Sequence, residues 1–219
     1  MKKLIISLTA ATALMSTAPA IAEGHTAYDW SGWYAGIFAS HGWGSMDMDP
    51  IHFTNLATPI DNDGFIAGIL GGYRMQQPNN VVYGVQVAVP LLSEKGGATH
   101  LAGALGVQTV ETNFGVIVTG QVGRAYGRWL PLVTAGAGMV SVTSTTATSN
   151  ITKVHPLITV GVGANFAVTE NVAVGARYNF VKVMRETHQN AFNACCNPEF
   201  GMDIHTLGAV LEFKLPVGN

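Results

Sequence analysis

The sequence predicts an all-β protein, an eight-stranded antiparallel up-and-down transmembrane β-barrel. Of the 219 residues only 11% are charged, while 48% are hydrophobic and 26 are glycine; an average soluble domain carries about 25% charged residues. The mature chain has no stretch of 18 or more apolar residues, so a membrane-spanning helix is not expected. Instead, apolar residues alternate with small or polar ones along several segments, which is the pattern of strands between lipid and a lumen.

The first 22 residues are expected to form a cleaved signal peptide. Lys2 and Lys3 precede a short apolar run, and an A-x-A signal-peptidase pattern ends at Ala22. An uncleaved N-terminal anchor is the alternative, but the run is interrupted by Ser and Thr. Residues 23–219 would then form one outer-membrane β-barrel domain.

Eight segments show the alternation. The clearest two, 157–168 and 172–184, are separated only by Thr169-Glu170-Asn171, which is the length of a tight hairpin. An even number of strands closes a barrel without an exposed edge. In residues 129–142 the alternation is weaker, and there we expect Val133, Ala135, Ala137 and Met139 to face outward. The remaining segments are 32–43, 65–75, 81–89, 114–123 and 206–215.

The connections fall into two classes that alternate along the chain. Those at 77–80, 127–128 and 169–171 are short, and those at 44–63, 93–110, 144–153 and 185–204 are long. Bacterial outer-membrane barrels have short periplasmic turns and long extracellular loops. Both chain ends are therefore predicted to lie on the periplasmic side.

A secreted soluble barrel of the lipocalin type has the same number of strands. Its outward parity would meet water and should carry Lys, Glu and Asp. Here one parity is Val, Ile, Leu, Phe and Tyr, and the other is Gly, Ala, Thr, Asn and Gln with an occasional charge. The apolar face is therefore predicted to face lipid and the small or polar face to line the lumen.

Six segments, in order along the chain, are typical of one family: GWYAGIFASHGWG, DNDGFIAGILGGYRMQ, NNVVYGVQVAV, NFGVIVTGQVGRAYGRWLPLVTAGAGMV, VGVGANFAVTENVAVGARYNFV and HTLGAVLEFKL. They resemble the 25- and 31-kilodalton surface-antigen type of alphaproteobacterial outer-membrane proteins, within the opacity and OmpA-like family of eight-stranded barrels. The resemblance implies a porin-like integral outer-membrane protein of Gram-negative bacteria with structural and surface-antigen roles.

The chain departs from that family in two places. The family often carries acidic residues on its third strand and arginines on its fourth, whereas Gln86, Ala88, Thr119 and Gln121 stand there. The lumen is thus less charged, which weakens a channel role. The family also ends on its last aromatic strand, whereas this chain continues for four residues after Leu215.

An eight-stranded barrel has an interior only wide enough for side chains to fill, and charges buried there must be paired. We therefore expect a lumen largely filled by side chains, with a polar network that stabilises the barrel. A narrow ion path or small diffusion channel is the alternative, and a loop-mediated adhesin or receptor is a third possibility. The network would comprise Arg74, Gln86, Thr119, Gln121, Asn165, Arg177, Asn179, Glu212 and Lys214.

Aromatic residues are expected at the two membrane interfaces. Trp33 and Trp43 have the same parity, and ten residues at about 3.3 Å per residue span about 33 Å along a strand. Tilted by about 45°, that is about 23 Å, close to the roughly 25 Å apolar band of such barrels. Tyr73 and Phe213 are expected to join them as interfacial anchors.

The long connections hold the remaining candidates. Adjacent Cys195 and Cys196 would form a vicinal disulfide or intermolecular links after export, with redox or metal chemistry as the alternative. The histidines of the loops and strand tips, His155 and His205 among them, are expected to be solvated, with a weak surface metal site as the alternative, and we expect no metal and no cofactor. The acidic loop residues of 46–63 would either solvate the loop or bridge divalent cations with lipopolysaccharide phosphates.

An enzymatic barrel is the third class to consider. Such an enzyme would carry a Ser or His beside an acid on the lipid-facing side, and only His41 has roughly that position, without an acid predicted next to it. We therefore expect no enzyme. The expected partners are outer-membrane lipids, lipopolysaccharide and the outer-membrane assembly machinery, and the protein is expected to be a monomer. The net charge of −2 offers no basic surface for nucleic acid.

Overall fold

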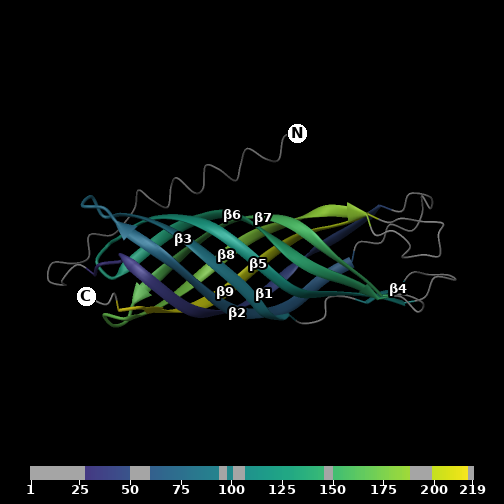
Figure 1. The fold of residues 1–219 in the computed structure, drawn as a ribbon, viewed down its shortest axis with the longest axis horizontal. Coiled ribbons are helices and arrows are strands. Elements are labelled where there is room, and N and C mark those ends of the chain that lie inside the picture. Colours follow the sequence, from purple (N-terminus) through teal and green to yellow (C-terminus); the bar gives the residue numbers. More distant parts are fainter. Residues whose placement is uncertain are drawn as a thin grey trace.

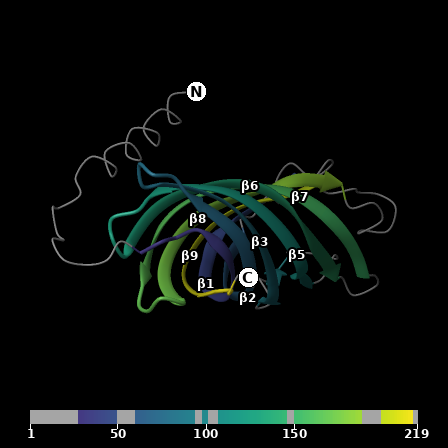
Figure 2. The same ribbon diagram turned by 60° about the vertical axis from the view of Figure 1, so that its left-hand side comes forward.

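The computed structural model describes residues 28–49, 60–93, 98–100, 107–145, 150–187 and 199–216. Eight long strands wind around a common axis and close into an antiparallel barrel (Figures 1 and 2), which confirms the predicted fold class. No helix in this part of the chain is long and apolar enough to cross a membrane. The long strands are β1 (Gly32–Asp49), β2 (Ile60–Gln76), β3 (Val81–Ser93), β5 (Val107–Arg124), β6 (Trp129–Thr145), β7 (Asn150–Ala167), β8 (Val172–Thr187) and β9 (Glu199–Lys214).

Consecutive long strands pair with each other, as do the first and the last, and together these pairings close the barrel. The first strand pairs with the last, with Tyr34 opposite Lys214. Strand β3 pairs with β5 over eight residues, from Val81 opposite Arg124 to Ala88 opposite Ile117. A ninth element that the sequence did not suggest, β4 (Ala98–His100), pairs with β5 beyond the reach of β3. All described residues of the long strands therefore belong to one closed sheet.

Short turns join the strands at one end of the barrel, which we call the turn end; the opposite end is the loop end. In the first turn the amide of Asn80 donates to the carbonyl of Gln77 over 2.9 Å, and in the last the amide of Val168 donates to Val172 over 2.8 Å. Asn80 and Gly127 have φ angles of 65° and 59°. Asn and Gly tolerate this left-handed region best, which is why these turns can be so tight.

The strands extend further toward the loop end than alternation predicted. Residues 44–49 and 60–63, expected in a loop, are paired in β1 and β2, with Met46 opposite Ile60. Residues 107–110, 150–153 and 199–204 likewise belong to strands. Ladder hydrogen bonds need backbone groups and not apolar side chains, so pairing continues after the hydrophobic pattern has ended.

The two faces of the sheet follow the predicted parity. On β6, Ala135, Ala137 and Met139 are exposed on the outside, whereas Leu132 and Thr134 are buried inside. Large apolar side chains cover the outer face in the same way on other strands, including Ile37, Ile69, Val85, Val118, Ile158 and Leu207. The barrel thus presents a continuous apolar belt outward.

Candidate functional site: the barrel lumen

The lumen is closed at the turn end by an apolar plug. The chain before β1 folds into the mouth of the barrel, where Tyr28 and Trp30 are buried with ring centroids 4.7 Å apart. They join one apolar cluster with residues from four strands and one turn: Val82, Ala125, Leu130, Leu132, Ala167 and Ala173.

Polar contacts hold this segment in place. The Trp30 amide donates to Gln76 Oε1 over 2.9 Å, and the Gln76 amide donates to Ser31 Oγ over 3.0 Å. Lys214 Nζ donates to the Asp29 carbonyl over 2.7 Å. The plug was not predicted from the sequence, although Trp30 has the same parity as the inward-facing Tyr34.

The charges around the plug shift two pKa values. Burial raises the pKa of the Tyr28 hydroxyl above its usual value. Burial also acts to raise the pKa of the Asp29 carboxyl, but hydrogen bonds from Ser31 and the positive charge of Lys214 outweigh it, so that pKa is lowered. Asp29 therefore carries its negative charge beside Lys214, with Oδ2 and Nζ 3.8 Å apart.

Directly above the plug lies a cluster of buried charges centred on Glu212, whose residue is 2% exposed. Arg74 donates two hydrogen bonds to the carboxylate, from Nη1 over 2.6 Å and from Nη2 over 2.9 Å. Arg177 Nη2 donates to the same carboxylate over 2.9 Å, and Asn165 Nδ2 over 2.8 Å. We call these four residues, with the three described next, the ion cluster.

Gln86 is the second centre of the ion cluster. Its Oε1 accepts hydrogen bonds from Gln121 Nε2 over 2.8 Å and from Arg177 Nη1 over 3.1 Å, and Tyr34 Oη lies 3.3 Å away. Arg74 links the two centres, because its Nε donates to Gln121 Oε1 over 3.1 Å. The ion cluster therefore joins side chains from β1, β2, β3, β5, β7, β8 and β9.

Small residues on the inner face make room for this packing. The guanidinium carbon Cζ of Arg74 lies over the Tyr34 ring, 4.0 Å from the centroid of that ring. A Cβ on Gly72 would lie 2.6 Å from Tyr34 Oη, and a Cβ on Gly175 would collide with Asn165 Oδ1. Glycine at these two positions allows the large polar side chains to cross the lumen.

The ion cluster carries a net positive charge, with two guanidinium groups and one carboxylate. Arg74 uses all three of its nitrogens in the bonds above. Arg177 uses two, and its Nε has no hydrogen-bond partner among the described residues. The ion cluster therefore has an excess of one positive charge, and Arg177 is the arginine with a donor nitrogen left unused.

The nine residues proposed as a lumen network occupy four places. Arg74, Gln86, Gln121, Asn165, Arg177 and Glu212 lie in the ion cluster, together with Tyr34, which sequence analysis did not single out. Asn179 is nearer the loop end, where its Nδ2 donates to Thr206 Oγ1 over 3.2 Å. Thr119 is buried in the wall without joining the ion cluster, and Lys214 contacts Asp29 at the turn end instead.

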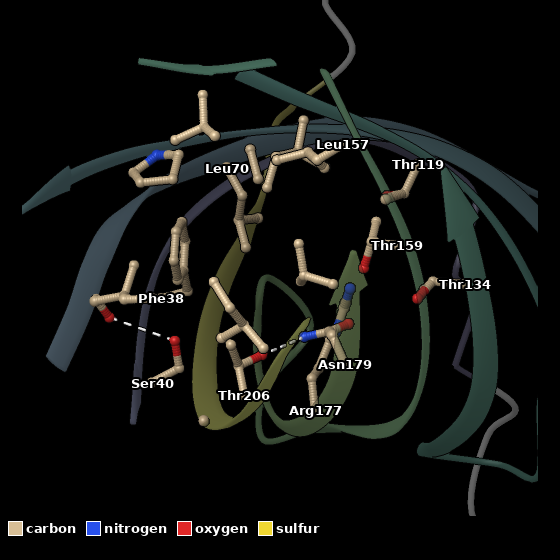
Figure 3. Close-up of a pocket in the computed structure, with 18 of the residues that line it drawn as sticks. Phe38, Ser40, Leu70, Thr119, Thr134, Leu157, Thr159, Arg177, Asn179 and Thr206 are labelled. Atoms are coloured by element: carbon tan, nitrogen blue, oxygen red, sulfur yellow. Dashed lines mark hydrogen bonds between the residues drawn. The ribbon is translucent and has the colours of Figure 1, made fainter. Parts of the chain in front are cut away.

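The loop-end half of the lumen differs from expectation. Above the ion cluster is a cavity of about 180 Å³ (Figure 3). The prediction that side chains largely fill the lumen therefore does not hold in this half. The wall of the cavity is also mainly apolar and not small or polar, because Phe38, Leu70, Leu157 and Met202 face inward. Polar groups also line the cavity, among them Thr119, Thr134, Thr159, Arg177, Asn179 and Thr206, with Ser40 across from the first three.

Comparison with known proteins agrees with this architecture. Residues 7–213 match the sequence family described as the outer membrane protein β-barrel domain. The chain belongs to this family. It is therefore an outer-membrane barrel protein of bacteria. A search of curated protein sequences gave no match.

Two solved structures show the similarity of fold. Neisserial surface protein A shares 17% identity with a TM-score of 0.53, over 84% of this chain and 98% of that one. OprG from Pseudomonas aeruginosa shares 11% identity with a TM-score of 0.51, over 86% of this chain and 99% of that one.

On the lipid-facing side of this outer-membrane barrel, aromatic residues form two groups. Near the turn end, Trp33 and Tyr73 pack with ring centroids 5.1 Å apart, and Phe213 is exposed on β9. Near the loop end, Trp43 stacks on His205 at 6.0 Å. All four predicted anchors therefore project outward, three of them at the turn end and one at the loop end.

Two histidines differ from expectation. His41 Nε2 lies 2.9 Å from Asp63 Oδ1 on the outer face, so an acid does stand beside it. Because β2 begins earlier than predicted, Asp63, which has the same parity as Phe65, lies in the strand and not in a loop. His155, expected to be solvated, is fully buried, and its Nδ1 lies 3.2 Å from the Met184 carbonyl oxygen. His205, half-buried, lies 2.6 Å from Tyr178 Oη through its Nδ1.

The remaining candidates are outside the described residues or show no cluster. Cys195 and Cys196 lie in the part of the chain that is not described, as do residues 1–22. Within the described ranges, no group of three or more His, Cys, Asp or Glu side chains could hold a metal ion.

Proposed function

We propose that this protein is a non-enzymatic structural barrel of the outer membrane, of the 25- and 31-kilodalton surface-antigen type, whose lumen does not conduct solutes. In this proposal the turn end faces the periplasm and the loop end faces outside. The observation that carries the proposal is the pair of successive barriers, the ion cluster and the apolar plug, across the lumen.

The two barriers oppose different solutes. An ion or polar molecule that entered from the loop end would have to separate Glu212 from two guanidinium groups, and breaking a buried ion pair costs about 3–5 kcal/mol. Below that level it would meet the closely packed rings of Tyr28 and Trp30 in the apolar plug. An eight-stranded barrel has no room for a second path beside these side chains.

Planar-bilayer recordings test the closed lumen directly. Purified, refolded protein is expected to give no reproducible unitary current steps, while a general porin inserted under the same conditions does. Steps that recur and scale with salt concentration would contradict the closed lumen and support the alternative of a small diffusion channel.

The envelope role depends on lipid contact and on correct assembly. We propose that the outward aromatic groups around Trp33 and Trp43 anchor a monomer between outer-membrane lipids and lipopolysaccharide, and that the final strand with Phe213 serves as the assembly signal. Cells lacking the protein should become more permeable to detergents, and restoring a chain in which short turns replace residues 50–59 and 188–198 should reverse this. Failure of that chain to restore the barrier, despite normal folding, would favour the loop-mediated adhesin or receptor.

Two further parts of the proposal concern residues outside the described ranges. We propose cleavage after Ala22, so intact-mass analysis of protein from outer membranes should give a chain that begins at Glu23. We also propose a vicinal disulfide between Cys195 and Cys196, formed in an oxidising compartment after export, which the same spectrum would show as a mass lower by two hydrogen atoms until a reductant is added.

A further inference from the structure

The cavity in the loop-end half of the lumen is the feature that the scaffold function leaves unexplained. Its wall is built from buried or half-buried side chains of several strands, among them Phe38, Leu70 and Leu157 (Figure 3), together with Met202 on β9. Close packing is the rule in protein interiors, and voids larger than a water molecule are few. A space of this size inside a barrel therefore needs an explanation.

Its volume suits a small organic molecule. The cavity measures about 180 Å³, and an apolar cavity of about 150 Å³ in an unrelated engineered protein stays dry and binds benzene. An apolar wall gives water few hydrogen-bond partners, so an apolar group gains free energy by filling the space.

The polar residues in the wall of the cavity indicate which polar group such a molecule would carry. Arg177 lines the cavity, is buried, and has an Nε without a partner among the described residues. Of the five N–H donors of a guanidinium group, the bonds to Gln86 and Glu212 use two. A buried positive charge that exceeds its counter-charge favours an anion beside it.

We propose that this cavity binds a small amphipathic carboxylate, an aromatic or short-chain aliphatic acid. Its apolar body would lie against Phe38, Leu70 and Leu157, and its carboxylate would accept hydrogen bonds from Arg177. Such a ligand would bring the charge of the ion cluster to zero and fill the void. The inference goes beyond the scaffold function and does not depend on it, because a closed lumen can hold a ligand without conducting it.

Methyl NMR in phospholipid nanodiscs can separate cavity binding from partition into lipid. Ile117, Ile204 and Met202 line the cavity, whereas Ile37, Ile69 and Ile158 are exposed on the lipid-facing side. Benzoate is the probe, and benzamide is its neutral counterpart of nearly equal shape. We expect benzoate to shift the cavity methyls along a saturating curve, while the lipid-facing methyls move little and without saturation.

Arg177→Gln tests the role of the charge. This variant keeps a hydrogen-bonding side chain and leaves Glu212 paired with Arg74, and the methyl spectrum itself reports whether the barrel is folded. Benzoate affinity should fall at least tenfold and benzamide affinity should change less than twofold. Equal binding of both probes to the wild-type protein, or equal loss of both in the variant, would overturn the assignment of a carboxylate site.

Ala88→Leu tests the cavity itself, since Ala88 lines it. The added methyl groups should occupy the space and reduce benzoate affinity at least tenfold. Ala137→Leu, the same change on the lipid-facing side of β6, is the matched control and should bind as the wild-type protein does. Absence of saturable shifts at the cavity methyls of the folded wild-type protein would overturn the proposal.

Discussion

Glu212 shows how much of the lumen depends on one side chain. It is the counter-charge of two buried arginines, and it accepts a fourth hydrogen bond from Asn165. Glu212→Gln should therefore lower the free energy of unfolding by about 3–5 kcal/mol, because it leaves uncompensated charges inside the barrel. Equilibrium unfolding in urea, followed by tryptophan fluorescence in lipid vesicles, measures the change.

The matched control for this prediction is an exposed ion pair in the same barrel. Asp203 and Lys182 lie 2.9 Å apart with both side chains substantially exposed. Asp203→Asn should cost less than about 1 kcal/mol, since surface pairs contribute little. If Glu212→Gln proved no more costly than Asp203→Asn, the ion cluster would not be the main source of stability in the lumen.

Asp29 gives a prediction about pH. Its pKa in the folded protein lies below the value in the unfolded chain, about 3.9. Its stabilising contribution is therefore fully present above about pH 4 and is lost as the pH falls through the folded pKa. A titration of the Asp29 carboxyl carbon by NMR should give a midpoint below 3.9, and Lys214→Met should raise that midpoint. A wild-type midpoint at or above 3.9 would show that the contacts with Ser31 and Lys214 do not persist in solution.

Single residues could be assigned to a face from the sequence, but not to a contact. Period-2 alternation is sufficient to place Arg74, Gln86 and Glu212 inward. It does not give the register between strands, which determines which inward side chains lie at the same level. Arg74 therefore reaches Glu212, whereas Lys214, two residues further along β9, contacts Asp29. Tyr34 was missed for the same reason, since its role depends on the space above Gly72 on another strand.

At the scale of elements, the segment before β1 that holds Tyr28 and Trp30 packs inside the barrel and forms part of its core. Trp30 is 4% exposed and lies among residues of several strands. Trp30→Ala should destabilise the barrel by about 3–5 kcal/mol through the cavity that it leaves. Trp30→Phe should cost less than about 1.5 kcal/mol, because the ring is largely kept and the unpartnered indole N–H is removed. Urea unfolding compares both, and equal costs would show that the plug is not closely packed.

The strand prolines explain why an interrupted pattern still forms strands. Pro90 lies just beyond the ladder of β3 with β5, Pro131 just beyond that of β5 with β6, and Pro156 just beyond that of β7 with β8. Each proline therefore has one side without a ladder, where a missing N–H breaks no hydrogen bond. The sequence shows the prolines but not the ladder ends, so it could not predict how far each strand extends.

For the whole molecule, the sequence predicted the closed barrel and its lipid-facing belt but not the contents of the lumen. Alternation separates two faces only where one of them is polar. Near the loop end both faces are apolar: Val181 and Val183 point into the lumen, and Met184 points outward. The alternation of residue types therefore cannot distinguish the lumen face from the lipid face there. The cavity results from the sum of many side-chain volumes across the barrel, which no local pattern records.

Closure of the barrel gives the last prediction. Gly120 lies within both ladders of β5, opposite Val85 on β3 and Ala135 on β6. Gly120→Pro removes a donor from a strand paired on both sides, unlike the three natural prolines, and should prevent closure between β3 and β5. Gel mobility in SDS measures this: the wild-type barrel should migrate differently unheated and heated, and the proline variant should lose that difference.

Gly120→Ala is the control that separates the backbone effect from the added carbon. Gly120 faces outward and a Cβ there would lie 3.8 Å from the nearest atom, the Ala135 carbonyl oxygen, which is an ordinary contact. The alanine variant should therefore keep the wild-type difference in mobility. Since every backbone donor in a membrane-spanning strand needs a partner within the protein, a proline variant that still resisted SDS unheated would contradict the pairing of β3 with β5 as the closing seam of the barrel.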